Sequence, residues 1–407
     1  MLEKMTNGSK RGDGGRTAGE QQDEDRAMIR LEALTKRYPG QRQAAVEELD
    51  LEIPAGRIVT FVGPSGCGKT TTMKLINRLI EPTSGRIHLD GRDVTEVAPH
   101  VLRRNIGYTI QQGGLFPHRT VADNIATVPR LLGWDRERIA ARVDELLDLV
   151  GLAPQTYRRR YPKQLSGGQQ QRVGVARALG GDPQVMLMDE PFGAIDPLNR
   201  EALQNEFLRI QAEVRKTIVF VTHDIDEAVK MGDRIAIFGD GGVVHQYDTP
   251  ERILADPADD FVSDFIGAGA SVRRLSLTPL GALPVPDWPT VGDSAGGEER
   301  AAAARRAGHG HLMVLDDDGR PAGWLRVEDG APGERLPLLT PLGPDATLFD
   351  ALDRMLAANS SALAVVDGDG GYRGVVTMDA VRELINSTAA HAPRPHGSGG
   401  SDALQEV

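Results

Sequence analysis

The stretch from Gly63 to Thr70, which reads GPSGCGKT, has the residue types and the spacing of a phosphate-binding loop. It fits the pattern G-x-x-x-x-G-K-[ST] in full, follows an apolar run at 58–62 and precedes a segment with helical spacing. Glycines let such a loop turn tightly, so that successive N–H groups and the positive end of the next helix point at one polyanion. Lys69 would reach the β- and γ-phosphates, and the Thr70 hydroxyl would hold Mg²⁺. The alternative to a phosphate-binding loop is a glycine-rich turn that precedes Lys and Thr by chance. The residues that we assign to the nucleotide are Gly63, Pro64, Ser65, Gly66, Cys67, Gly68, Lys69, Thr70 and Thr71.

Two carboxylates follow a second apolar run, at 185–188. A buried parallel strand explains the run, and the carboxyl end of such a strand is where a doubly wound sheet places its chemistry. Asp189 would hold Mg²⁺, through water, and Glu190 would accept a proton from the attacking water. A third strand, at 217–221, leads to His223, which could hydrogen-bond the γ-phosphate. A histidine at a strand end is also often a solvent-facing residue, and both interpretations stay open.

Two further features could bind parts of a nucleotide. The segment 165–172 reads LSGGQQQR, in which Ser166 can cap a helix and two glycines leave backbone amides open to an anion. Tyr38 lies in a turn upstream of the phosphate-binding loop, where an aromatic ring could stack on a purine base. An ordinary turn tyrosine explains Tyr38 equally well on these grounds.

The bulk properties exclude several classes of protein. At 407 residues the chain is expected to form two or three domains of ordinary globular composition. No apolar run approaches the roughly 18 residues that a membrane-spanning helix needs, so we expect a cytosolic protein, which leaves docking on a membrane protein open. The net charge of -11 and the pI near 5.4 argue against a nucleic-acid partner bound through a basic face. A single cysteine excludes an internal disulfide and a thiolate metal cluster.

Composition and periodicity divide the chain into five parts. Helical spacing between about 113 and 165 interrupts an alternating strand and helix pattern, and Asp135 is the expected cap of one of these helices. Weak periodicity with Pro, Gly, Ala and Arg after residue 267 indicates a linker. The expected parts are a disordered tail at 1–27, an α/β nucleotide-binding domain at 28–267 with a helical subdomain at about 113–165, a linker at 268–310, a repeated α+β region at 311–387 and a disordered tail at 388–407.

The C-terminal region contains an internal repeat. Residues 311–319 align with 362–370 at an offset of 51, and 323–325 then align with 374–376. Each copy reads as strand, acidic turn and strand, and an amphipathic helix at 344–358 precedes the second copy. A chance likeness of two hairpins is the alternative, but the register holds over both strands and the turn.

The order of these motifs resembles the ATP-binding subunit of an ABC transporter, over about residues 28–267. The resemblance implies a P-loop NTPase fold, with ATP and Mg²⁺ as cofactors. It also implies that two copies face each other as a homodimer. The signature of one copy (Ser166, Gly167, Gly168 and Gln169) would then close on the γ-phosphate held by Lys69 of the other.

The same resemblance implies further site residues. Gln111 would bind Mg²⁺ and link the site to a permease, Tyr38 would stack on adenine, and Glu190 would be the catalytic base. His223 and Gln111 would complete the catalytic set, and Asp196 falls in the loop that meets the opposite subunit. That loop reads Gly-Ala-Ile-Asp where the family usually has Ser-Ala-Leu-Asp, so communication across the dimer is expected to differ in detail.

The implied partners are two integral-membrane permease subunits and an extracytoplasmic solute-binding protein, with no nucleic acid. The implied location is the cytoplasmic face of the cell membrane.

A finer resemblance concerns the solute and the repeat. Residues 106–134, 246–250 and 261–267 are similar to the ATPases of importers for compatible solutes such as glycine betaine, carnitine, choline and proline. The repeat resembles a tandem pair of CBS domains, which such ATPases often carry. CBS pairs commonly bind adenine nucleotides or sense ionic strength. The nucleotide-holding positions are incomplete in both copies, which have Arg326 with Asp329 and Thr377 with Ala380. A regulatory role and a passive, dimer-stabilising role therefore both stand.

Other functions compete with uptake of a compatible solute. The chain could serve an ABC importer for a different small polar solute or amino acid, or it could be a non-transport ABC ATPase that acts on ribosomes or DNA. Non-transport members usually carry two such domains or a long coiled-coil insertion, and the sequence shows neither. A regulatory module without turnover would require Glu190 to be inactive.

Overall fold

The computed structural model describes residues 26–109, 114–193, 195, 197–283, 285, 288–306 and 310–389. Gln111 and Asp196 lie outside the described residues, as do the expected tails except for residues 26–27 and 388–389. The chain divides into two compact units, Met1–Pro250 and Glu251–Val407.

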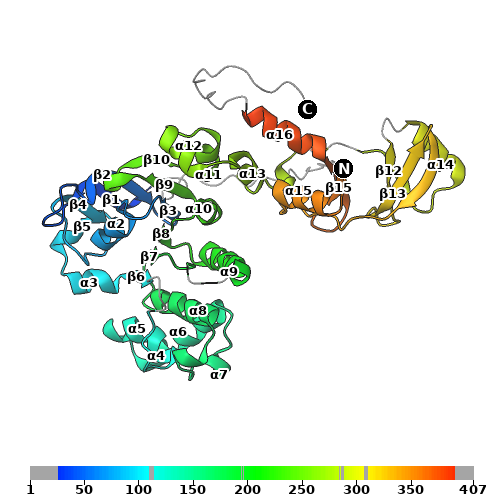
Figure 1. The fold of residues 1–407 in the computed structure, drawn as a ribbon. Helices are drawn as coiled ribbons and strands as arrows, with labels where there is room; N and C mark the ends of the chain where they lie inside the picture. The colour runs from blue at the N-terminus through cyan, green and yellow to red at the C-terminus, as the bar shows by residue number, and fades with distance from the viewer. Residues whose placement is uncertain are drawn as a thin grey trace, which may run out of the picture. The chain divides into compact units, whose positions relative to one another are not determined.

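A six-stranded sheet with the order β10-β9-β3-β8-β7-β6 forms the centre of the first unit (Figure 1). Neighbours from β9 to β6 run parallel, and β10 is antiparallel to β9 at the edge. β3 and β8 are buried at every position, which explains why four of the five residues in each strand are apolar. The strands are β3 (Ile58–Val62), β6 (Ile106–Thr109), β7 (Val185–Asp189), β8 (Thr217–Val221), β9 (Arg234–Phe238) and β10 (Val244–Asp248).

A second, antiparallel sheet has the order β2-β1-β4-β5. Buried and exposed residues alternate along much of β2, as expected for a sheet with one face toward a core. The turn at 38–40 lies between β1 and β2, as the sequence predicts. The strands are β1 (Ala27–Lys36), β2 (Val46–Pro54), β4 (Ser84–Leu89) and β5 (Arg92–Asp93).

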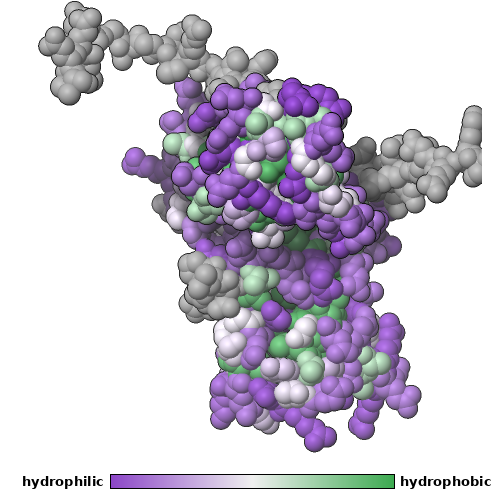
Figure 2. All heavy atoms as spheres, turned by 90° about the vertical axis from the view of Figure 1, so that its right-hand side faces the viewer, coloured by the Kyte–Doolittle hydropathy of each residue, from purple (hydrophilic) through white to green (hydrophobic). Residues whose placement is uncertain are grey.

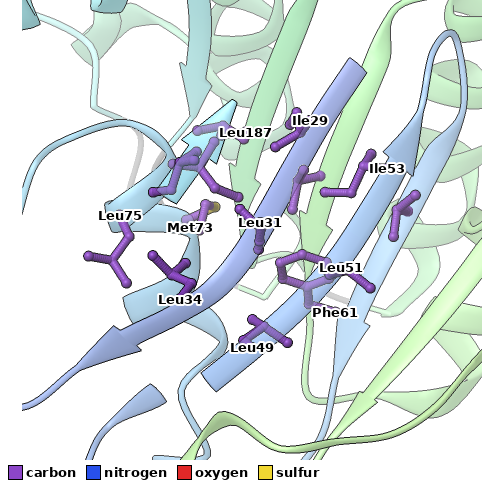
Figure 3. Close-up of a cluster of buried hydrophobic side chains, with 14 of the residues drawn as sticks. Ile29, Leu31, Leu34, Leu49, Leu51, Ile53, Phe61, Met73, Leu75 and Leu187 are labelled. Carbon is purple, nitrogen blue, oxygen red and sulfur yellow. The ribbon is translucent and has the colours of Figure 1, made fainter. Parts of the chain in front are cut away.

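One hydrophobic cluster joins the two sheets. Figure 3 shows that side chains of β1 and β2, such as Leu31 and Leu51, lie near Phe61 of β3 and Met73 of α2 (Lys69–Ile76). Leu31, Phe61 and Met73 are at most 1% exposed. This core therefore fixes the strand that leads into the phosphate-binding loop and the helix that leaves it.

The predicted helical subdomain is present, and Figure 1 draws its helices together below the sheet. The Asp135 side chain accepts a hydrogen bond from Arg138 N, as expected of the helix cap. A second hydrophobic cluster joins these helices to β7 and β8. The helices are α4 (Val121–Ile125), α5 (Thr127–Leu131), α6 (Arg136–Leu149), α7 (Pro154–Tyr157) and α8 (Gly167–Leu179). This part of the chain also contains the α-helices α3 (Pro99–Arg104), α9 (Pro197–Val214) and α10 (Ile225–Met231).

The second unit contains regular structure where the sequence predicts a linker. Between residues 268 and 310 lie α13 (Ala270–Leu275), β11 (Thr290–Gly292) and α14 (Gly297–Arg306), so the linker prediction is wrong for most of this range. Weak apolar periodicity hid α14, because Ala303 and Ala304 are its buried residues. α11 (Pro250–Ala255) begins at the last residue of the first unit, and α12 (Asp260–Ile266) follows it in the second.

The offset of 51 residues extends through these elements. α14 corresponds to α15 (Leu348–Ala357), and β12 (His311–Leu315) corresponds to β15 (Ala362–Val366). Val291 pairs in parallel with Val314, and Leu342 pairs in the same way with Val365. The first copy therefore begins near residue 290.

The copies differ after their second strand. In the first copy, β13 (Pro321–Glu328) is followed by a further strand, β14 (Ala331–Leu336). In the second copy, β16 (Tyr372–Thr377) is followed by α16 (Met378–Ala389). The hairpins pack through a cluster that contains Met313, Trp324, Ala364 and Val375, and Tyr372 N donates to Gly319 O at 3.0 Å.

The surface is polar over most of the face drawn in Figure 2, where apolar residues show as separate areas. Among the residues that the structure describes, no helix has both the length and the apolar character needed to cross a bilayer.

We predict that Leu31→Ala destabilises the first unit by about 2–5 kcal/mol, because it leaves a cavity in the core that joins the two sheets. Leu79→Ala is the matched control, since Leu79 is 43% exposed and its truncation should cost less than about 1 kcal/mol. Urea unfolding, followed by far-ultraviolet circular dichroism, measures the change in stability of both variants. Equal unfolding midpoints for the two variants would contradict the prediction.

Candidate nucleotide-binding site

The phosphate-binding loop connects β3 to α2, as the sequence predicts. Gly63, Gly66 and Gly68 have φ values of 151°, 86° and 110°, which L side chains rarely adopt. A Cβ at Gly63 would lie 2.2 Å from Phe238 O, and one at Gly68 would lie 2.5 Å from Ala45 O. Glycine is therefore required at both ends of the loop for conformation and for space.

Lys69 lies inside this loop and is 6% exposed. Its Nζ donates to Gly63 O at 2.7 Å and to Pro64 O at 2.8 Å, and it lies 3.4 Å from Cys67 Sγ. The loop carbonyls thus hold the ammonium beside the backbone that would surround a phosphate. Cys67 is 1% exposed, which fits a small residue that fills space within the loop.

Thr70 and Asp189 meet at the carboxyl edge of the sheet. Thr70 Oγ1 donates to Asp189 Oδ1 at 3.0 Å. Burial raises the pKa of Asp189 and the Glu190 charge adds to this, while the hydrogen bond from Thr70 opposes it. A hydroxyl and a carboxylate are the hard oxygen ligands that Mg²⁺ prefers, so this pair fits the predicted metal site.

Glu190 and His223 are also brought together. His223 Nδ1 lies 3.2 Å from Glu190 Oε1. Glu190 follows β7 with a φ of 44°, and its N–H donates to Val221 O at 2.9 Å. The left-handed backbone turns Glu190 away from the strand direction, an uncommon conformation for a residue with a side chain. The Glu190 side chain is 25% exposed, which leaves it open to a water molecule.

The signature segment opens α8. Ser166 Oγ accepts from Gln169 N at 3.3 Å, and Gln169 Oε1 accepts from Ser166 N at 3.1 Å, which is a capping box. Ser166, Gly167 and Gly168 line a depression of about 430 Å³. In Figure 1, α8 lies with the other subdomain helices and apart from α2.

Three predicted residues are not tested by this geometry. Gln111 and Asp196 lie outside the described residues. Tyr38 is half-buried in its turn, and Lys36 Nζ lies 5.3 Å from its ring centroid. Stacking of Tyr38 on adenine stays a prediction.

Sequence reasoning missed two residues near the site. Tyr157 OH accepts from Gln169 Nε2 at 3.2 Å. Glu227 on α10 is 9% exposed, and Gln204 Nε2 donates to its Oε1 at 3.1 Å. The spacing Asp224-x-x-Glu227 predicts the start of a helix, and Asp224 does cap α10. The spacing does not predict that the Glu227 side chain is buried.

The chain is similar to proteins of known families. The family model described as ABC transporter matches residues 46–193, and the model described as CBS domain matches residues 339–387. The osmoprotectant import ATP-binding protein OsmV of Salmonella typhimurium is 43% identical over 371 residues, which cover 88% of this chain and 97% of that protein. The carnitine transport ATP-binding protein OpuCA of Listeria monocytogenes is 42% identical and covers 88% of this chain and 92% of its own length.

A solved structure agrees with the fold. The cbiO1 protein of Clostridium perfringens, part of the ABC transporter complex cbiONQ, has a TM-score of 0.54 at 25% identity. The match covers 62% of this chain and 95% of that protein.

The chain belongs to the ABC transporter family, as one of its ATP-hydrolysing subunits. Its relatives with matching C-terminal regions serve osmoprotectant and carnitine import.

We predict that Glu227→Gln raises the melting temperature relative to wild type by an amount that grows as the pH rises above about 4.5, the ordinary pKa of glutamate. Burial raises the pKa of Glu227, so the folded protein keeps this proton to higher pH than the unfolded chain does. The wild type therefore loses stability as the pH rises above the ordinary glutamate value, and the neutral amide avoids that loss.

Glu201→Gln is the control for this experiment, since the Glu201 side chain is 75% exposed. Its effect on the melting temperature should not grow with pH. A pH-independent difference between Glu227→Gln and wild type would show that ionisation of Glu227 does not affect folding.

Proposed function

We propose that this subunit hydrolyses ATP to drive import of a compatible solute of the glycine betaine, carnitine, choline and proline class. The observation that carries the proposal is the match to the osmoprotectant import protein over 88% of this chain, which includes the C-terminal unit. A spermidine/putrescine import relative from Acidothermus cellulolyticus is 47% identical, but the match covers 63% of the chain. The long matches therefore favour the osmoprotectant class over a polyamine.

The residues at the carboxyl edge of the sheet fit MgATP. Loop amides and Lys69 would bind the phosphates, and Tyr38 would contact the adenine. Thr70, Asp189 and Gln111 would hold Mg²⁺, which neutralises charge on the phosphates when it is bound. Glu190 would take a proton from the attacking water, and His223, which contacts Glu190, would orient the γ-phosphate.

A second copy of the chain would complete each site. The Ser166 hydroxyl and the amides of Gly167 and Gly168 form the start of α8, which lies apart from α2 in the same chain. The open depression beside these residues leaves them accessible to a nucleotide carried by another protomer. Asp196 would lie in the loop that meets the opposite subunit, so ATP would be bound between two protomers.

Membrane partners would dock on the segment that follows Gln111. Phe116 is 38% exposed, while its backbone N–H donates to Asn124 Oδ1 at 2.7 Å. Asn124 is fully buried and donates to Phe116 O, Arg119 O and Thr120 O. A firmly held backbone that exposes an aromatic side chain suits a docking surface. The proposed assembly is a homodimer with two permease subunits and an extracytoplasmic binding protein, at the cytoplasmic face of the membrane.

We predict that Glu190→Gln lowers ATP hydrolysis by about 100-fold or more, because the amide cannot accept a proton from water. MgATP binding and ATP-dependent dimerisation should persist, because the phosphate-binding residues are unchanged. Phosphate release and analytical ultracentrifugation measure the two properties. Glu213→Gln, at a 62% exposed side chain, is the control and should hydrolyse ATP at the wild-type rate. Undiminished hydrolysis by Glu190→Gln would remove Glu190 from the role of base.

The C-terminal repeats are proposed to regulate uptake in response to ionic strength or to a nucleotide. Thr377 Oγ1 accepts from Ala380 N at 3.2 Å, so this hydroxyl caps α16, and Ala380 stands where the family pattern has an acid. We predict that truncation after Gly267 makes uptake by the reconstituted transporter insensitive to salt and to adenine nucleotides. The full-length transporter measured in parallel is the control. An unchanged response would favour the passive, dimer-stabilising role.

A further inference from the structure

We propose that Tyr157 is a positioning residue, which holds the signature segment in the shape that binds a nucleotide carried by the second protomer. The inference rests on the proposed two-protomer site. Tyr157 OH accepts from Gln169 Nε2 at 3.2 Å. The other end of the same amide accepts from Ser166 N at 3.1 Å. The Gln169 side chain is thus held at both ends, and one of these ends is Tyr157.

This arrangement determines what Ser166 can offer to a ligand. Ser166 Oγ uses a lone pair to accept from Gln169 N, so its O–H remains able to donate. Gly167 and Gly168 occupy the first turn of α8, where backbone N–H groups have no partner within the helix. The Ser166 O–H and the N–H groups of Gly167 and Gly168 are therefore three neighbouring hydrogen-bond donors, an arrangement that can bind a phosphate.

Loss of the Tyr157 hydroxyl would loosen this group of donors. Gln169 would keep its bond to Ser166 N but would lose its second anchor, so its long side chain would gain access to other rotamers. The capping box would then be occupied for a smaller fraction of the time, and the donors would be less often aligned. Tyr157 contributes in this way without touching the nucleotide.

Tyr157 is itself fixed by the helical subdomain. It closes α7, and the Arg160 guanidinium lies 4.7 Å from its ring centroid. The residues that follow it pair with the start of α4, since Val121 N donates to Arg160 O at 2.8 Å and Ala122 N donates to Arg158 O at 3.0 Å. The Tyr157 hydroxyl therefore connects the signature segment to α7 and, through the backbone bonds, to α4.

The test uses the full-length chain with Glu190→Gln as the parent, so that ATP is bound but not consumed. Tyr157→Phe removes the hydroxyl and keeps the ring. Tyr161→Phe is the matched control, because Tyr161 is a nearby tyrosine with 41% exposure. Binding of a fluorescent ATP analogue at low protein concentration measures the affinity of the monomer. Analytical ultracentrifugation with MgATP measures the association constant of the dimer.

We expect Tyr157→Phe to leave the affinity of the monomer for ATP unchanged and to weaken association. One neutral hydrogen bond corresponds to about two- to tenfold, and a symmetric dimer contains it twice, so the association constant should fall by about four- to hundredfold. Tyr161→Phe should match the parent. In the Gln169→Leu background, Tyr157→Phe should cause no further weakening, since its partner is absent.

Each other outcome is decisive. If the parent does not dimerise with MgATP, the two-protomer site fails, and this inference fails with it. If the parent dimerises and Tyr157→Phe dimerises equally well, the inference alone is overturned. It is also overturned if the variant loses ATP affinity as a monomer, or if its effect persists in the Gln169→Leu background, because either result indicates a general structural defect.

Discussion

The site depends on one constraint, which is that β3 and β7 both pair in parallel with β8. Because of this shared neighbour, the carboxyl ends of the two outer strands meet at one edge of the sheet. β3 leads through the loop to Thr70, and β7 ends at Asp189, so the hydroxyl and the carboxylate reach hydrogen-bonding distance across β8. His223 follows β8 itself and meets Glu190 at the same edge. Three strands that are distant in the sequence thereby assemble one group of polar side chains.

Much of this assembly could be predicted because its signals are local. The glycine spacing of the phosphate-binding loop, the apolar run before Asp189 and the strand before His223 each specify a short element and the side chain at its end. The core explains these signals, since strands that are buried on both faces consist mostly of apolar residues. Parallel pairing places the carboxyl ends of all three strands on the same side of the sheet, and the observed order β3-β8-β7 makes them neighbours.

The features that sequence reasoning missed depend on weak or non-local signals. β11 has three residues, and α14 buries mainly alanine, so neither produces a strong hydrophobic pattern. The contact between Tyr157 and Gln169 joins α7 to α8, and the contact between Gln204 and Glu227 joins α9 to α10. Such contacts are set by the packing of helices, and the residue types alone do not specify them.

The C-terminal duplication is unequal, because one copy ends in the strand β14 and the other in the helix α16. The correspondence between the two copies therefore stops after their second strand, where one copy adds β14 to its sheet and the other continues into α16. In an assembly of two chains, a contact between β14 and β14 or between α16 and α16 would therefore differ from a contact between β14 and α16.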